Sequence, residues 1–244
     1  MIELLLILLF ISFYGLSMIG DRKGILFFLF GFLLHAGYIL YRAFFLGWIP
    51  VTERYDILLV MALLVALSLF YLYLYKKVPL KMLMDTIPLF VVLLSFFAVF
   101  QERMDSIDPN MNSIWFYLYI IFFILGFSSF TVSAIAGIFY LRERSVLHEM
   151  TQYRAALFGW LLFSFSLIGG SVWFYLTYGS YWLWTAKELW ITVVWFYYSF
   201  YLHSRMMSSF FGKPAAILGI EGFPILVFSY LGVTPLLGSP WSQF

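Results

Sequence analysis

Histidine supplies the only soft nitrogen ligands in this sequence, because the chain has three histidines and no cysteine. His35 lies in the middle of the apolar run 24–46, and His203 lies near the end of the run 188–204. An ionisable side chain at membrane depth is costly to keep and normally faces a partner or a ligand. Two neutral imidazoles from different helices are the axial ligands that a b-type haem requires. Hydrogen bonding of each histidine to a neighbouring helix is the alternative, and the spacing alone favours neither interpretation.

The other residues that could carry chemistry indicate little catalysis. His148 lies in the charged stretch 141–150, where we expect a solvated surface residue. The lack of cysteine excludes disulfides, thiolate metal sites, iron–sulfur clusters and covalent attachment of haem to this chain. The sequence contains no glycine-rich phosphate loop, zinc-binding histidine pair or nucleophile–base triad. Its catalytic residues, if it has any, are therefore unknown.

A cluster of tryptophans is the second feature suited to a ligand. The stretch 178–205 holds Trp182, Trp184, Trp190 and Trp195. Trp and Tyr are enriched at the membrane–water interface, which explains one or two of these rings. The rings alternate with the charged residues Lys187 and Glu188, and a flat aromatic platform with charges at its rim would suit a large planar ligand. Both interpretations stay open.

The composition places these residues in a membrane. Of the 244 residues, 64% are hydrophobic and 11% are charged, whereas a soluble domain carries about 25% charged residues. Apolar runs long enough to cross a hydrocarbon core of about 30 Å predict an all-α integral membrane protein, a bundle of eight transmembrane helices in one domain over residues 1–244. The runs cover 2–20, 24–46, 56–75, 82–100, 114–141, 155–177, 188–204 and 215–237. The first run lacks the basic start and cleavage site of a signal peptide, so we expect a retained span.

Lysine and arginine predict the orientation of this bundle, because cytoplasmic loops are enriched in them. Ten of these basic residues follow odd-numbered runs and four follow even-numbered runs. Both termini and the Trp-rich loop 178–190 are therefore predicted to lie on the outer side. Arg42 and Arg54 near that side could bind haem propionates, because Arg forms two parallel hydrogen bonds to a carboxylate. For Arg42 we expect instead that the side chain extends to the interface.

Residues 179–205 resemble the tryptophan-rich WWD signature and the following helix of the CcsA/ResC family, which handles haem in System II cytochrome c biogenesis. The residues that carry this resemblance are Gly179, Trp182, Trp184, Lys187, Glu188, Trp190, Leu202, His203 and Arg205. Further similarity covers most of the chain, at His35, Arg42, Gly47, Pro50, Tyr55, Asp56, Trp115, Gly126, Gly137, Tyr140, Leu141 and 230–233.

The sequence departs from the pattern of that family on the predicted outer side. Tyr178 stands at the first tryptophan of the signature, and Thr185-Ala186 replaces its Asp-Pro. The resemblance implies two outer-face histidines that bind haem, at the positions of Tyr119 and Trp241, and this chain has neither.

The resemblance implies a haem-handling protein of the bacterial cytoplasmic membrane or the thylakoid. The implied iron ligands are His35 and His203, positions that resemble the intramembrane histidine pair of the family, and they would hold a non-covalent haem b. Trp182, Trp184, Trp190 and Arg54 would form the rest of the site. The implied partners are a CcsB/ResB-like protein and a c-type cytochrome, within a haem–cytochrome c ligase. The alternative is an electron-transfer or structural subunit of a respiratory or photosynthetic complex that reuses this fold.

Overall fold

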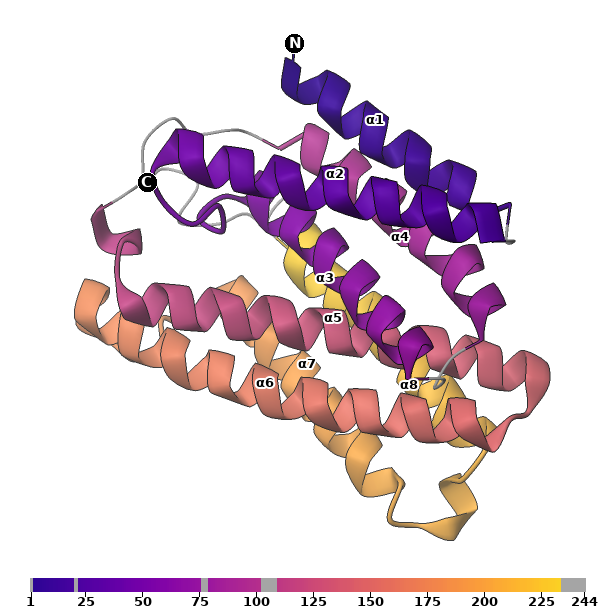
Figure 1. Ribbon diagram of the computed structural model, residues 1–244. Helices are drawn as coiled ribbons and strands as arrows, with labels where there is room; N and C mark the ends of the chain where they lie inside the picture. The colour runs from indigo at the N-terminus through magenta and orange to yellow at the C-terminus, as the bar shows by residue number, and fades with distance from the viewer. Residues whose placement is uncertain (1, 20–21, 76–78, 102–108, 234–244) are drawn as a thin grey trace. The chain divides into compact units, whose positions relative to one another are not determined.

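Eight α-helices make up most of the part of the chain that the structure describes, and they confirm the predicted all-α class (Figure 1). The computed structural model describes residues 2–19, 22–75, 79–101 and 109–233, and no strand occurs among them. The helices are α1 (Ile2–Ser17), α2 (Arg22–Leu46), α3 (Arg54–Leu74), α4 (Leu80–Val99), α5 (Ile114–Glu143), α6 (Val146–Tyr178), α7 (Ala186–Ser204) and α8 (Lys213–Val227). A π-helical turn, Phe228–Gly232, continues α8.

The lengths of the helices identify an integral membrane protein. By length and composition α2, α3, α5, α6 and α8 with its π-helical turn can each cross a membrane. The apolar parts of α1 and α4 are shorter. Helices α5 and α6 have 30 and 33 residues, or about 45 and 50 Å at 1.5 Å per residue. Both are therefore longer than a hydrocarbon core of about 30 Å.

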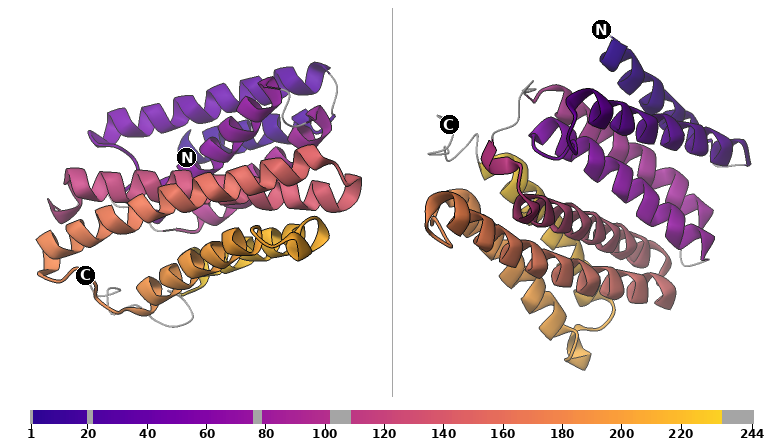
Figure 2. Two further views of the ribbon diagram at one scale, coloured as in Figure 1. Left: turned by 90° about the horizontal axis from the view of Figure 1, so that it is seen from below. Right: turned by 60° about the vertical axis from the view of Figure 1, so that its left-hand side comes forward.

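The chain divides into two compact units, Met1–Asn112 and Ser113–Phe244. In the first unit α1 packs on α2 and α4, and α3 packs on α4. In the second unit α5 and α6 pair along their length, α8 packs on α5, and α7 packs on α6 and α8 (Figure 2). The single domain over residues 1–244 stays a prediction.

Local signals in the sequence set the ends of the helices in the second unit. Ser113 and Ser145 cap α5 and α6, because each side chain accepts a hydrogen bond from a backbone N–H of the first turn. Gly179 ends α6 with a φ of 72°, a left-handed conformation that glycine adopts without steric cost. These signals place the Trp-rich loop directly between α6 and α7.

Small residues bring α5 and α6 close together. A Cβ added to Gly126 would lie 3.3 Å from the carbonyl oxygen of Gly159, and one added to Gly159 would lie 2.8 Å from the ring of Phe130. Small residues at such a contact let two helix backbones approach, and the gain in van der Waals packing holds the helices together in lipid. Helix α8 packs against α5 of this pair, and α7 packs against α6.

Candidate functional site

His35 is fully buried inside the first unit. Its ring stacks on Phe10 of α1, with centroids 4.2 Å apart and planes 5° apart, and the ring of Tyr14 meets it edge-on at 6.2 Å. The backbone of Leu59 in α3 also lies close to the ring. No described residue forms a hydrogen bond of normal geometry with either imidazole nitrogen, so the approach of the Leu59 backbone is the nearest polar contact that the ring has. Nearly all buried polar groups in proteins are hydrogen-bonded, so unpaired nitrogen atoms are unusual for a buried side chain.

His203 lies in the last turn of α7, where its side chain is exposed. Its Nδ1 lies 2.8 Å from the carbonyl oxygen of Ser199. A carbonyl can only accept, so Nδ1 carries a proton, and in the neutral imidazole this leaves the lone pair on Nε2. Ligating histidines usually have this arrangement, in which the second ring nitrogen donates to a backbone carbonyl. The hydroxyl of Ser199 in turn accepts a hydrogen bond of 2.8 Å from Nε1 of Trp160 in α6, which fixes α7 against α6.

The Trp-rich loop presents its rings to different degrees. Trp184 is 73% exposed and has a φ of 57°, a left-handed conformation that is uncommon outside glycine. Trp182 is half-buried, and its carbonyl oxygen accepts a hydrogen bond of 2.9 Å from Ser180. Nearby, Tyr181 stacks on Tyr175 of α6 with ring centroids 4.4 Å apart. The loop is therefore a defined structure that holds Trp184 outward.

Glu188 forms the inner side of this loop. Only 5% of the surface of this residue is exposed. One carboxylate oxygen, Oε2, accepts hydrogen bonds from the backbone N–H groups of Leu183, at 2.9 Å, and Thr185, at 3.3 Å. Thr185 accepts from the N–H of Glu188 in return, which completes the reciprocal capping box that starts α7.

The structure brings together only part of the predicted site. Trp190, in the second turn of α7, packs edgewise on Phe228 with centroids 4.7 Å apart, close to the loop that carries Trp182 and Trp184. His203 is thirteen residues further along the same helix, about 20 Å at 1.5 Å per residue. The tryptophans and His203 therefore form separate parts of the second unit, at opposite ends of α7.

Arg42 differs from its prediction. It is 5% exposed, and its Nε and Nη2 donate to the two carboxylate oxygens of Asp56, at 3.0 and 2.9 Å. Its guanidinium lies 5.0 Å from the ring of Tyr55, whose hydroxyl is hydrogen-bonded to that of Tyr38. The prediction that Arg42 extends to the interface was wrong, because a buried carboxylate on the next helix binds it. Arg54 is exposed at the start of α3.

His148 was also predicted wrongly. It lies in the first turn of α6 rather than in a loop, and it is 2% exposed. Its Nε2 is 2.9 Å from a carboxylate oxygen of Glu143, and its ring lies 5.9 Å from that of Phe139. The short turn between α5 and α6 folds this histidine against the end of α5, which gives it a structural environment.

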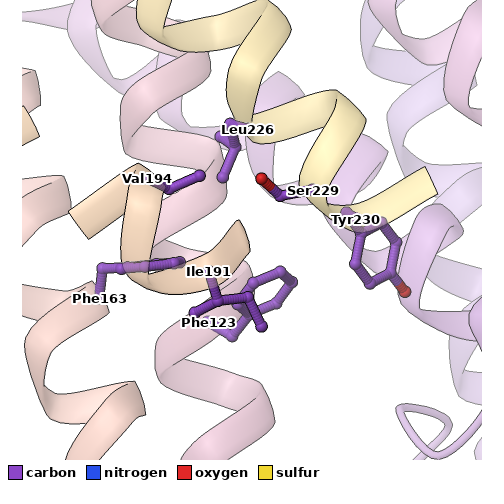
Figure 3. A pocket seen from close by; sticks show the side chains of 7 residues that line it. All are labelled: Phe123, Phe163, Ile191, Val194, Leu226, Ser229 and Tyr230. Atoms are coloured by element: carbon purple, nitrogen blue, oxygen red, sulfur yellow. The ribbon is translucent and has the colours of Figure 1, made fainter. Parts of the chain in front are cut away.

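A pocket lies between the helices of the second unit (Figure 3). It is too narrow to admit a water molecule, and the hydroxyl of Ser229 at its edge donates to the carbonyl oxygen of Ile225 at 2.8 Å. Its lining residues are Phe123, Phe163, Ile191, Val194, Leu226, Ser229 and Tyr230. We interpret it as a packing gap beside the π-helical turn rather than as a cofactor site.

Comparison with known proteins identifies the family. A family described as "Cytochrome C assembly protein" matches residues 51–238, more than half of the chain. The protein belongs to this family. CcsA, the cytochrome c biogenesis protein, is 25% identical in Chlamydomonas reinhardtii and 24% identical in Guillardia theta, in each case over 77% of this chain and over 58% and 74% of the relative. CcsA of Prochlorococcus marinus (strain NATL1A) is 41% identical over 37% of this chain.

The matches to the cytochrome c assembly family cover the candidate site unevenly. The family match includes the Trp-rich loop, Glu188 and His203 but begins after His35 and Arg42. The match to the Prochlorococcus relative spans 28% of the length of that protein, and the match to the algal Chlamydomonas relative spans 58%. Trp241, where an outer histidine was expected, lies outside the described residues, and Tyr119 packs against Trp173 with centroids 6.2 Å apart.

Sequence reasoning missed the contacts that hold these residues in place. Thr185-x-x-Glu188 is a readable capping-box pattern, and it would have predicted both the start of α7 and the inward position of the carboxylate. The bond from Nδ1 of His203 to Ser199 follows from a spacing of four residues on one helix. The stacking of His35 on Phe10 and the pairing of Arg42 with Asp56 join different helices, and no local pattern indicates them.

Proposed function

We propose that this protein holds a b-type haem in the membrane and handles haem for the maturation of c-type cytochromes. The observation that carries the proposal is the state of His35, a fully buried imidazole with no hydrogen bond of normal geometry to any described residue. Ionisable residues at membrane depth mark functional sites more often than structural ones. The family to which the chain belongs is a cytochrome c assembly family, and this supports haem as the ligand.

His203, which lies in the second unit whereas His35 lies in the first, is the second proposed iron ligand by its resemblance to the family. Its Nδ1 donates to Ser199, and Nε2 stays available, so the residue fits axial ligation of haem iron. A haem held by these residues would supply one-electron chemistry at its iron. The residues of this chain hold the haem, exclude water from His35 and keep the proton of His203 on Nδ1.

The Trp-rich loop has a separate role in the proposal. Because Trp182 and Trp184 lie at the other end of α7 from His203, they would receive haem at a second position, on the outer side of the membrane. The exposed ring of Trp184 suits stacking on a planar macrocycle. Arg54, which is exposed on the first unit, is a proposed ligand of a haem propionate. A CcsB/ResB-like protein and a c-type cytochrome are the proposed partners at that face.

A haem measurement on the purified full-length protein tests this function. We expect a low-spin b-type signal in the reduced-minus-oxidised spectrum and about one haem per chain by pyridine haemochrome. His35→Ala and His203→Gly should each lose most of this haem, whereas His148→Gln, a histidine with its own partner, should retain it. Added imidazole should restore the spectrum of His203→Gly, which separates loss of a ligand from loss of the fold.

Two outcomes would contradict the proposal. Haem stoichiometry that is unchanged in both ligand variants would remove His35 and His203 from the site. The protein could also bind haem, form a stable complex with redox subunits and fail to restore cytochrome c maturation in a deletion strain. These three results together would instead assign the protein to electron transfer.

A further inference from the structure

We infer that Glu188 is a positioning residue, which sets the conformation of the loop that carries Trp182 and Trp184. Its buried carboxylate oxygen Oε2 accepts from the N–H groups of Leu183 and Thr185. These two residues flank Trp184, so one side chain binds the loop on both sides of that tryptophan. The part of this inference that concerns haem rests on the proposed function, and the part that concerns the loop does not.

The backbone conformation of Trp184 explains why the loop needs the hydrogen bonds to Glu188. Its φ of 57° is unfavourable for a residue with a Cβ, and such conformations persist only where the surrounding structure imposes them. A left-handed residue makes the neighbouring N–H groups converge into a concave site that favours an anion. In this protein Glu188, in the first turn of α7, fills that concavity, and the same backbone turn directs Trp184 outward, where 73% of it is exposed.

Capping of α7 alone does not account for these contacts. A capping box requires the N-cap hydroxyl to accept from the third helical N–H and the third side chain to accept from the N-cap N–H. Glu188 does this with Thr185, but its shortest bond, 2.9 Å, goes to Leu183, two residues before the cap. The carboxylate therefore fixes the backbone of the loop as well as the start of the helix.

We expect hydrogen-bond acceptance, rather than negative charge alone, to hold the loop. Both N–H groups bond to the same oxygen, Oε2, and the carbonyl oxygen of a glutamine can accept two hydrogen bonds in the same place. Glu188→Gln should therefore keep the loop. Glu188→Leu has a similar volume and keeps the helix propensity, but it leaves the two N–H groups without an acceptor.

A single spin label tests this inference in the full-length protein. Because the chain has no cysteine, Tyr181→Cys provides one labelling site inside the loop, at a residue that is 58% exposed. The mobility of the label is measured by electron paramagnetic resonance in four backgrounds, the parent, Glu188→Leu, Glu188→Gln and Thr185→Ala. The Thr185→Ala background is the control for weakening of the helix start, because it removes the hydroxyl and leaves the bonds from Leu183 and Thr185 to Glu188. Haemin affinity is measured by absorbance titration of the same proteins without label.

We expect a several-fold gain in label mobility and about tenfold weaker haemin binding in Glu188→Leu, and values near those of the parent in the other two. Unchanged mobility in folded Glu188→Leu would overturn the inference. Equal damage in Glu188→Gln would also overturn it, because it would assign the effect to charge. If Glu188→Leu does not fold by circular dichroism, Glu188→Ala takes its place. A parent that binds no haemin would refute the proposed function, while the label would still decide the role of Glu188 in the loop.

Discussion

Replacing Asp56 with alanine should be the most damaging single change in the first unit. The carboxylate of Asp56 is fully buried and binds two nitrogen atoms of Arg42, which is itself 5% exposed. Removing one partner of a buried pair leaves an uncompensated charge, which costs about 3 to 5 kcal/mol. In Asp56→Ala the guanidinium keeps only a weaker contact of 3.5 Å to Glu3 and the face of Tyr55, worth about 1 kcal/mol. We therefore expect a loss near 3 kcal/mol.

The assay is equilibrium unfolding of the purified protein in mixed micelles with a rising fraction of a denaturing detergent. Asp85, which is exposed on α4, provides the matched control, because Asp85→Asn changes a carboxylate of the same unit without a buried partner and should cost less than about 0.5 kcal/mol. The double variant Arg42→Met with Asp56→Leu removes both charges together. Its stability should return to within about 1 kcal/mol of the parent, because an apolar pair avoids the cost of burying charge.

The double variant decides whether the reasoning is correct. If Arg42→Met with Asp56→Leu were as unstable as Asp56→Ala, the damage would come from lost packing around these positions and the argument from uncompensated charge would fail. If Asp56→Ala itself cost no more than Asp85→Asn, Arg42 would have another way to reach water, and its burial between α2 and α3 would be refuted.

Two further variants test backbone geometry through the melting temperature. Trp184→Gly should leave the melting temperature unchanged or raise it slightly. The change removes a left-handed conformation that costs a residue with a Cβ about 1 to 2 kcal/mol, and it adds an entropic cost for glycine of roughly 0.5 to 1 kcal/mol. A clear fall in melting temperature would show that the loop depends on the indole. Gly159→Ala should destabilise by about 1 to 3 kcal/mol, because its Cβ would lie 2.8 Å from the ring of Phe130. Gly37→Ala, which meets nothing within 4 Å, is its control and should be neutral or stabilising by up to about 1 kcal/mol.

The sequence predicted the helices well where hydrophobicity marks them. Every apolar run of the prediction corresponds to one of the eight helices, because a run long enough to span lipid has to satisfy its backbone within itself. The start of α6 was missed by nine residues, since 146–154 contains His148, Glu149, Gln152 and Arg154. A helix that continues past the hydrocarbon core has no hydrophobic signal there, and only the cap at Ser145 indicates it.

The sequence predicted which residues could form the candidate site, but it did not predict which residues contact them. Histidine and tryptophan can be recognised in a sequence because few other side chains bind iron or present large flat rings. Their surroundings depend on which helices pack together. The pairing of Arg42 with Asp56 joins two helices across a loop, and the stacking of His35 on Phe10 joins residues 25 positions apart. Arg42 and Asp56 were both recognised by resemblance, but their pairing was not, because pairing is a property of the fold.

Helix α7 connects the parts of the second unit that matter for the proposal. At its start, Glu188 holds the loop of Trp182 and Trp184. At its end, the carbonyl of Ser199 orients His203, while the hydroxyl of the same serine accepts from Trp160 of α6. A helix of 19 residues is about 28 Å long, so one rigid element fixes both ends at once. A change in how α7 packs on α6 would therefore displace His203 and the tryptophan loop together, and Ser199→Ala should alter both the haem spectrum and the mobility of a label at position 181.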